Sequence, residues 1–259
     1  RGCTAKCIFC PAWTFSGQSV RFRSPKNILE EVRQCVERFG IREFYFNADT
    51  FTAEKDWTIG LCKALIDSGL NIRWGCNSRV NTIDGERLHW MKKAGCWVIG
   101  FGIETGNPET LEKINKGTTL AEAEEAVRLC KEAGIRVHTF FVIGFPWETE
   151  DHIKDTIRFA RKLDPDFFDF NIATPLRGTP FWGMVQRQGV LENTDGSYGQ
   201  AAVRTIALSA DKLTEIRRKA LWGMYLRPQY IFRTLRNAGS WSKRMNYLRA
   251  ATRRARGLL

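Results

Sequence analysis

Short apolar runs alternate with longer amphipathic stretches along most of this chain, and the alternation predicts a repeated strand-then-helix unit. Runs rich in aromatic and β-branched residues predict buried strands over 42–48, 71–77, 97–103, 135–143 and 167–173. Helical periodicity predicts helices over 24–39, 52–68, 84–94, 108–114, 119–133, 148–163 and 180–187. Apolar strands that alternate with helices are typical of a parallel sheet covered on both faces.

Capping residues support these boundaries. Ser24 and Pro25 form a typical helix start, and glycines follow the predicted ends of four helices, at Gly40, Gly69, Gly95 and Gly134. The spacing fits either a βα barrel or a doubly wound sheet, and both place functional groups at the carboxyl ends of the strands. We interpret the chain as truncated, because it starts without methionine, and we expect one more strand before Cys3.

The composition is that of a globular protein with one large or two small domains: 259 residues, 43% hydrophobic and 26% charged. We expect a core domain over 1–188 and a helical extension over 189–259, with the polar turn region 189–199 between them. The sequence contains no run of 18 apolar residues and no signal peptide. We therefore expect a cytoplasmic protein without a membrane-spanning helix.

Positive charge is concentrated in the last part of the chain. Residues 211–259 carry +11 of the net +12, so the preceding 210 residues are nearly neutral. Three interpretations of this basic, aromatic-rich tail remain open: a helical cap on the core, an amphipathic helix on an anionic membrane, and a nucleic-acid patch. The nucleic-acid interpretation is the least favoured of the three.

Three cysteines lie within eight residues, at Cys3, Cys7 and Cys10, and predict a metal site. A zinc site usually needs a second pair of cysteines or histidines, and no such pair is evident. Iron–sulfur clusters normally take four thiolates, so three would leave one iron open to a ligand. A zinc loop and unrelated loop cysteines are the alternatives. The other five cysteines are expected to be small core residues in a reducing compartment.

The cysteine spacing, with Phe9 just before the third cysteine, resembles the signature of the radical S-adenosylmethionine (radical SAM) superfamily. The resemblance runs from Arg1 to about Trp182 and implies an α/β fold, a partial (βα)6 TIM-like barrel with its first strand truncated. It also implies that Cys3, Cys7 and Cys10 bind a 4Fe–4S cluster whose fourth iron chelates SAM. An electron from a donor such as flavodoxin or ferredoxin would then cleave SAM to a 5′-deoxyadenosyl radical.

Further positions resemble the family at strand ends and imply contacts with SAM. Asp49 matches the residue for the amino group of SAM, although Ala48 stands where relatives often have a first acid, and a helix N-cap is the alternative role. Glu104 suits the two ribose hydroxyls, because an ionised carboxylate accepts hydrogen bonds from both. Lys116 matches the position that pairs with the carboxylate of SAM; a solvated surface lysine is the alternative. Arg79 matches a polar position facing the SAM pocket, or serves as a structural ion-pair partner.

Two turns complete the resemblance. Gly144 begins a turn that lies by the adenine in relatives, with Trp147 at a position where glycine is common. Ile172, at the end of the last strand, is also assigned to the cofactor pocket. In the segment 174–180, Arg177 stands where proline is usual. Each turn is a weak signal alone, but their order at successive strand ends is a strong one.

The segments 21–25 (RFRSP) and 226–228 (LRP), together with the strand-end motifs, look most like one branch of the family. Members of that branch usually carry a cobalamin-binding domain before the barrel, and include methyltransferases and enzymes of tetrapyrrole and hopanoid biosynthesis. Cobalamin would enter through a domain before Arg1. The resemblance favours C-methylation of a small, lipid-like or tetrapyrrole-like substrate over rearrangement, cyclisation or oxidation. A tRNA-modifying radical SAM enzyme and a non-catalytic cluster-binding or zinc-binding protein are the alternatives.

Overall fold

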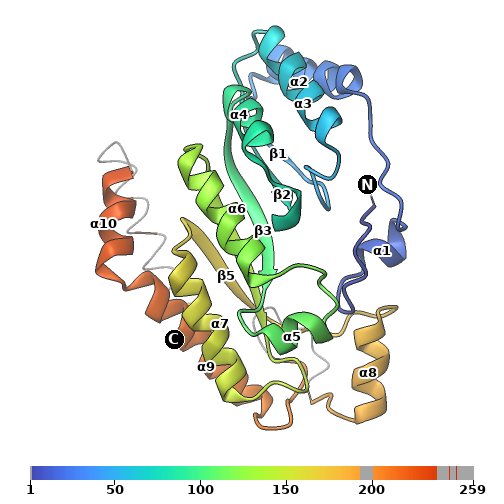
Figure 1. Cartoon of the computed structure of the whole chain (residues 1–259), viewed down its shortest axis with the longest axis vertical. Coiled ribbons are helices and arrows are strands. Elements are labelled where there is room, and N and C mark those ends of the chain that lie inside the picture. The colour runs from blue at the N-terminus through green and yellow to red at the C-terminus, as the bar shows by residue number, and fades with distance from the viewer. Residues whose placement is uncertain (1, 193–200, 238–244, 246–248, 250–259) are drawn as a thin grey trace.

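The computed structural model describes residues 2–192, 201–237, 245 and 249. Its centre is a sheet of five parallel strands, whose spatial order equals their order in the chain (Figure 1). The strands are β1 (Glu43–Phe46), β2 (Arg73–Ser78), β3 (Cys96–Glu104), β4 (Arg136–Ile143) and β5 (Phe167–Ile172). All five strands match predicted ones within two residues at each end.

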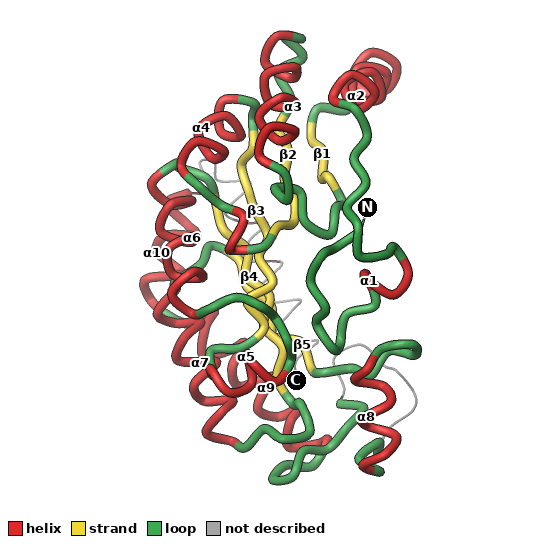
Figure 2. The backbone as a smooth tube through the Cα atoms, turned by 45° about the vertical axis from the view of Figure 1, so that its right-hand side comes forward, coloured by secondary structure: helices red, strands yellow, loops and turns green. Residues whose placement is uncertain are grey.

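The strand order decides between the two expected architectures. Each new strand is added on the same side of the sheet, so right-handed crossovers place the connecting helices on one face. Figure 2 shows these helices along one side of the curved sheet, while α1 and the N-terminal loop lie on the other side. A doubly wound sheet would carry helices on both faces. The partial barrel is therefore the observed fold.

The helices begin and end largely where local signals predict. The hydroxyl of Ser24 accepts from the backbone N–H of Asn27, and Gly40 ends that helix at φ 66°. Thr119 and Glu122 form a reciprocal capping box. The helices flanking the strands are α2 (Pro25–Phe39), α3 (Lys55–Asp67), α4 (Gly85–Lys93), α5 (Pro108–Lys113), α6 (Leu120–Glu132), α7 (Glu150–Leu163) and α8 (Pro180–Gln188). Two short elements were not predicted, α1 (Ala12–Phe15) and the 3₁₀ turn Val80–Thr82.

The main core lies between the sheet and its helices. Cys62, Cys76, Cys96 and Cys130 are buried there, as predicted for small core residues. Burial raises the pKa of the Cys62 thiol to about 12, so it is neutral and chemically quiet. Cys35 differs, because it is only half-buried. All eight cysteines lie within the described residues and are free thiols.

The last described helices pack against the end of the sheet. Helix α9 (Ala210–Tyr225) lies along β5, and the Nε of Arg217 donates to the carbonyl of Phe170 at 2.6 Å. Helix α10 (Pro228–Asn237) follows it. The division at 188/189 stays a prediction. The tail residues 238–244, 246–248 and 250–259, with most of its predicted basic and aromatic positions, lie outside the described residues. None of the helices within the described residues combines the length and apolar character needed to cross a bilayer.

Candidate functional site

The loop that carries the three cysteines lies across the carboxyl ends of the strands. Backbone hydrogen bonds join Ile8 to the carbonyl of Ile114 and Phe181 to the carbonyl of Ile8, each at 3.0 Å. The Nδ2 of Asn115 donates to the carbonyl of Lys6 at 3.1 Å. The loop is thus held between the end of α5 and the start of α8, with Cys7 buried and Cys3 and Cys10 half-buried.

Burial disfavours the thiolate forms of Cys7 and Cys10, and two nearby cations offset part of this effect at Cys7. Burial raises the pKa of Cys7, while the nearby cations of Lys116 and Arg79 act in the opposite direction. The Nη1 of Arg79 lies 4.0 Å from the Sγ of Cys7. Burial also raises the pKa of Cys10, and its neighbours Cys7 and Cys3 raise it further, since three thiolates close together repel one another. A cationic iron cluster would relieve that repulsion.

The donor set can be compared with the two kinds of metal site. Within the described residues, no three His, Cys, Asp or Glu side chains converge as they would around a single metal ion. The ligands of a 4Fe–4S cluster need not converge in this way, because each thiolate binds a different iron. Three soft thiolates on one loop suit iron–sulfur chemistry and leave the fourth iron for another ligand. The residues present therefore fit the cluster.

Glu104 and Lys116 form a buried ion pair beside this loop, with Nζ 2.7 Å from Oε1. Glu104 ends β3 in the left-handed region at φ 71°, which is uncommon for a residue with a side chain. Gly102 makes room for the pair: a Cβ at that position would lie 2.3 Å from the Glu104 Oε1. The interpretation of Lys116 as a solvated surface lysine is therefore wrong.

Arg79 and Asp49 border the same region. The Nη2 of Arg79 donates to the carbonyl of Lys116 at 2.5 Å, so this guanidinium links the ion-pair segment to Cys7. Asp49 accepts from the backbone N–H of Gly2 at 3.1 Å, next to Cys3. The residue that caps α3 is Glu54, so the N-cap role considered for Asp49 is wrong. Both residues thus lie beside the cysteine loop.

Aromatic rings and a buried acid shape the other side of the loop. Phe9 packs on Phe145 with centroids 5.7 Å apart, and Phe145 stacks on Trp147 at 5.2 Å. Gly144 adopts φ 89°, a conformation that favours glycine. Glu148, which the sequence analysis did not single out, is fully buried, and its Oε2 accepts from the backbone N–H groups of Gly144 (2.6 Å) and Phe145 (3.0 Å). The only sequence signal for this role was that Glu148 lies four residues after Gly144, close enough to accept from the backbone of the turn.

Glu148 and Ile172 hold the turn rather than face the loop. Burial raises the pKa of Glu148 to about 7, although the two N–H groups act against the shift. The side chain of Ile172 is buried, and its Cγ2 lies 3.4 Å from where a Cβ of Gly144 would be, beside Leu213 of α9. The side chain of Ile172 therefore points into the main core. Only the backbone of Ile172 reaches the strand end, where its carbonyl accepts from the hydroxyl of Thr174.

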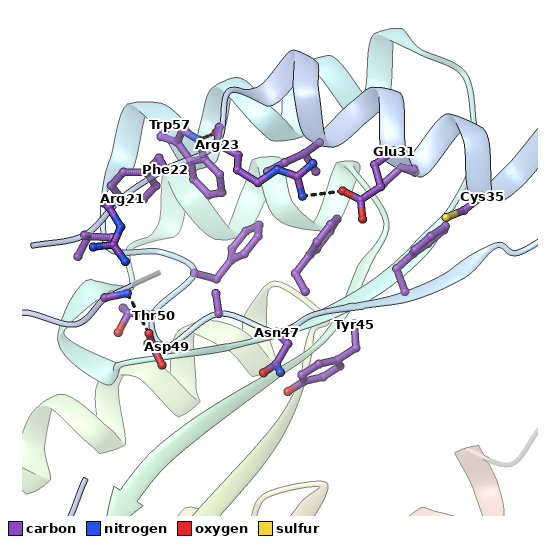
Figure 3. Close-up of a pocket in the computed structure, with 18 residues that line it drawn as sticks. Arg21, Phe22, Arg23, Glu31, Cys35, Tyr45, Asn47, Asp49, Thr50 and Trp57 are labelled. Atoms are coloured by element: carbon purple, nitrogen blue, oxygen red, sulfur yellow. Dashed lines mark hydrogen bonds and ion pairs between the residues drawn. The ribbon is translucent and has the colours of Figure 1, made fainter. Parts of the chain in front are cut away.

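A cavity of about 620 Å³ lies beside β1, between this strand, α2 and the segment that precedes α2. Figure 3 shows Asp49 and Thr50 at one end and the Arg23–Glu31 ion pair (2.6 Å) against α2. Its lining is largely apolar and includes Phe22, Phe44 and Phe46. This largely apolar cavity therefore extends to Asp49 and to Gly2, next to Cys3.

The chain is similar in sequence to several known proteins. It is 34% identical over 238 residues to an uncharacterized methyltransferase, PH0819, of Pyrococcus horikoshii, covering 91% of this chain and 52% of that protein. It is 33% identical over 192 residues to the anaerobic magnesium-protoporphyrin IX monomethyl ester cyclase of Cereibacter sphaeroides, covering 73% of this chain and 31% of the cyclase. The chain thus spans about half or less of the length of these relatives.

The fold is similar to that of the radical S-adenosylmethionine methyltransferase TsrM from Kitasatospora setae, solved with cobalamin and a [4Fe-4S] cluster. The TM-score is 0.72 at 18% identity, covering 88% of this chain and 51% of TsrM, which supports the fold alone. The model of the radical SAM superfamily matches residues 1–160, a segment that contains the cysteine loop, the ion pair and the Gly144 turn. The chain therefore belongs to the radical SAM superfamily.

Proposed function

We propose that this chain is the catalytic core of an enzyme that binds a 4Fe–4S cluster and SAM at the carboxyl ends of its strands. The observation that carries the proposal is the three-cysteine loop lying directly beside the buried Glu104–Lys116 pair. When bound, the cluster supplies one-electron reductive cleavage of SAM to methionine and a 5′-deoxyadenosyl radical, which abstracts hydrogen from a substrate. A donor such as flavodoxin or ferredoxin provides the electron.

The residues of the site have distinct tasks in this proposal. Cys3, Cys7 and Cys10 hold the cluster, and Arg79 together with Lys116 offsets the negative charge of their thiolates. Glu104 accepts from the ribose hydroxyls and Lys116 binds the carboxylate of SAM. Because these two side chains neutralise each other without a ligand, the pair keeps both charges stable in a buried place until SAM arrives.

The remaining SAM contacts are assigned by position. Asp49, beside Cys3, accepts from the amino group of SAM. Phe9 and Gly144 border the adenine, where a turn held by Glu148 keeps backbone close to a flat ring. Ile172 supports this wall from the core and offers its backbone only.

The reaction that we propose is C-methylation of a small, lipid-like or tetrapyrrole-like substrate. The names of the relatives support it: one is a methyltransferase and another acts on a magnesium porphyrin. Because those proteins are longer than this chain, cobalamin would be held by a part of the full protein outside these residues. Rearrangement or cyclisation of such a substrate is the second candidate, favoured by the cyclase relative.

Anaerobic reconstitution with iron and sulfide tests the proposal. After reduction in the presence of SAM, we expect about four irons per chain and 5′-deoxyadenosine detected by chromatography. One zinc per chain after anaerobic purification, without iron uptake, would contradict it and favour a structural zinc site. Tight tRNA binding by the reconstituted chain would instead favour the RNA-modifying alternative.

We also propose that the C-terminal part brings the enzyme to an anionic membrane. On α10, Ile231 and Phe232 are 41% and 66% exposed, and residues 211–259 carry a net charge of +11. An apolar face combined with basic residues suits the surface of an anionic bilayer. The test is sedimentation with phosphatidylglycerol vesicles, with Phe39→Ser, an exposed residue of α2, as control. The double variant Ile231→Ser/Phe232→Ser should lose binding; equal binding by all three proteins would contradict this role.

A further inference from the structure

The concave face of the sheet carries side chains that have no role in the proposed binding of the cluster and SAM. Asn77, Gly100 and His138 are register partners across β2, β3 and β4, so they lie in one row. Along β4 and β5 the burial alternates, with Val137, Phe141 and Phe170 buried against the helices and residues 138, 140 and 169 half-exposed on the other face. The row therefore faces the interior of the partial barrel.

Glycines in this face let large side chains lie against the sheet. A Cβ at Gly75 would meet two ring carbons of Tyr45 at 3.1 Å, and a Cβ at Gly100 would meet the ring of Phe140 at 3.0 Å. Tyr45 is 51% exposed, and its hydroxyl donates to the Oδ1 of Asn77 at 2.5 Å. In Figure 3, Tyr45 and Asn47 lie at the edge of the cavity and their side chains point away from α2. The rings of Tyr45 and Phe140 therefore lie against the concave face at these two glycines.

His138 and Asp169 form a hydrogen-bonded pair on this wall. The Nε2 of His138 lies 2.7 Å from the Oδ2 of Asp169, and their side chains are 28% and 33% exposed. An ionised carboxylate only accepts hydrogen bonds, so Nε2 carries the proton and Nδ1 of the neutral ring is an acceptor. Within the described residues no hydrogen bond reaches Nδ1. The ring of Phe140 lies beside the imidazole, with centroids 4.3 Å apart.

The His138–Asp169 pair lies below the proposed SAM site, at a distance that leaves room for a substrate between them. Glu104 is the register partner of Phe141, three residues further along β4 than His138. At about 3.3 Å per residue, His138 is roughly 10 Å below the ribose-binding position. A molecule held there would present its edge toward the 5′ carbon of SAM. This step rests on the proposed function, because that function places SAM at Glu104.

We propose that this wall binds the substrate as a flat conjugated ring that carries an N–H group. The ring lies against Tyr45 and Phe140, and its N–H donates to the Nδ1 of His138. Asp169 acts as a positioning residue, because its hydrogen bond fixes the tautomer in which Nδ1 accepts. The wall thus selects for ring shape through its aromatic side chains and for the N–H group through a single acceptor.

Two probes of matched shape test the proposal. Indole carries an edge N–H, whereas benzofuran has an oxygen in its place and cannot donate. The binding of each to the full chain, reconstituted with cluster and SAM, is measured by calorimetry or ligand-observed nuclear magnetic resonance. We expect His138→Ala to weaken indole binding about tenfold and to leave benzofuran binding unchanged. His138→Gln should keep part of the indole affinity, since its amide oxygen is an acceptor, and Asp169→Asn should weaken indole binding alone.

His89→Ala is the matched control, because His89 is exposed on α4, away from the concave face. Failure of indole to bind the parent chain, or equal losses for indole and benzofuran in His138→Ala, would overturn the proposal. The same samples report 5′-deoxyadenosine formation without substrate. Loss of SAM cleavage with intact discrimination between the probes would count against the proposed function only. Intact cleavage without discrimination would count against this wall only.

Discussion

The Nζ of Lys116 lies 2.7 Å from the Oε1 of Glu104, and each of these buried charges is the ion-pair partner of the other. The pair joins the end of β3 to the segment after α5, and Arg79 extends it to Cys7. A buried ion pair contributes little net stability, but removing one partner leaves an uncompensated charge. In the proposed function, this pair is a preformed binding site whose carboxylate would accept from the ribose of SAM and whose ammonium would bind the carboxylate of SAM.

This relationship predicts a non-additive mutant cycle. Lys116→Met should lower the free energy of unfolding by about 3 kcal/mol, because Glu104 remains buried without a partner. Adding Glu104→Gln should recover most of that loss, while SAM binding stays abolished. Denaturant unfolding of the apo-proteins measures the stabilities and equilibrium dialysis measures SAM binding. Additive losses would show that the two side chains do not depend on each other.

Gly102 offers a second test of the same pair. A Cβ there would lie 2.3 Å from the Oε1 of Glu104, so Gly102→Ala should displace the carboxylate and raise the Kd for SAM at least tenfold. The cluster should still assemble. Gly85→Ala is the control, because no atom lies within 4 Å of the added Cβ. Equal SAM affinity in the two variants would show that Glu104 does not bind the ribose of SAM.

Glu148 predicts a pH dependence of stability. Its folded pKa, about 7, is raised above the ordinary value of 4.5 by burial, so the folded state holds this proton more tightly than the unfolded state. The resulting stability is full below pH 4.5 and is lost as the pH rises through 7. Relative to Glu148→Gln, the parent should lose roughly 2 kcal/mol between pH 5 and pH 8. Denaturant unfolding at both pH values measures this, and parallel pH profiles would contradict it.

The ion pairs of Asp164 predict that this residue holds α10 against the end of α7. Asp164 ends α7 in the left-handed region and forms ion pairs with Arg227 and Arg233, which also donates to the carbonyl of Pro165. Asp164→Asn keeps a side chain that tolerates this conformation but removes the charge. Hydrogen exchange in 228–237 should become faster, with a global change below about 1 kcal/mol. Asp151→Asn, at the start of α7, should leave that exchange unchanged; equal effects of the two variants would show that α10 is held by other contacts.

The features predictable from the sequence are those encoded locally. Helix ends followed from Ser24, Gly40 and Thr119, because a cap needs only its neighbours along the chain. The burial of Lys116 and the pairing of His138 with Asp169 were not predicted, because they depend on how β3, β4 and β5 are aligned. Strand periodicity shows which residues share a face, but not which residue of the next strand lies opposite.

The role of the cysteine loop was inferred from its resemblance to the radical SAM signature, and cluster binding by Cys3, Cys7 and Cys10 stays a prediction. The measurement that tests the central claim most directly is the 5′-deoxyadenosine formed by single cysteine variants after anaerobic reconstitution and reduction with SAM. We predict that Cys3→Ala, Cys7→Ala and Cys10→Ala form none above background. The core variant Cys130→Ala and the half-buried Cys35→Ala should match the parent. Parental amounts of product from any of the three loop variants would contradict the account.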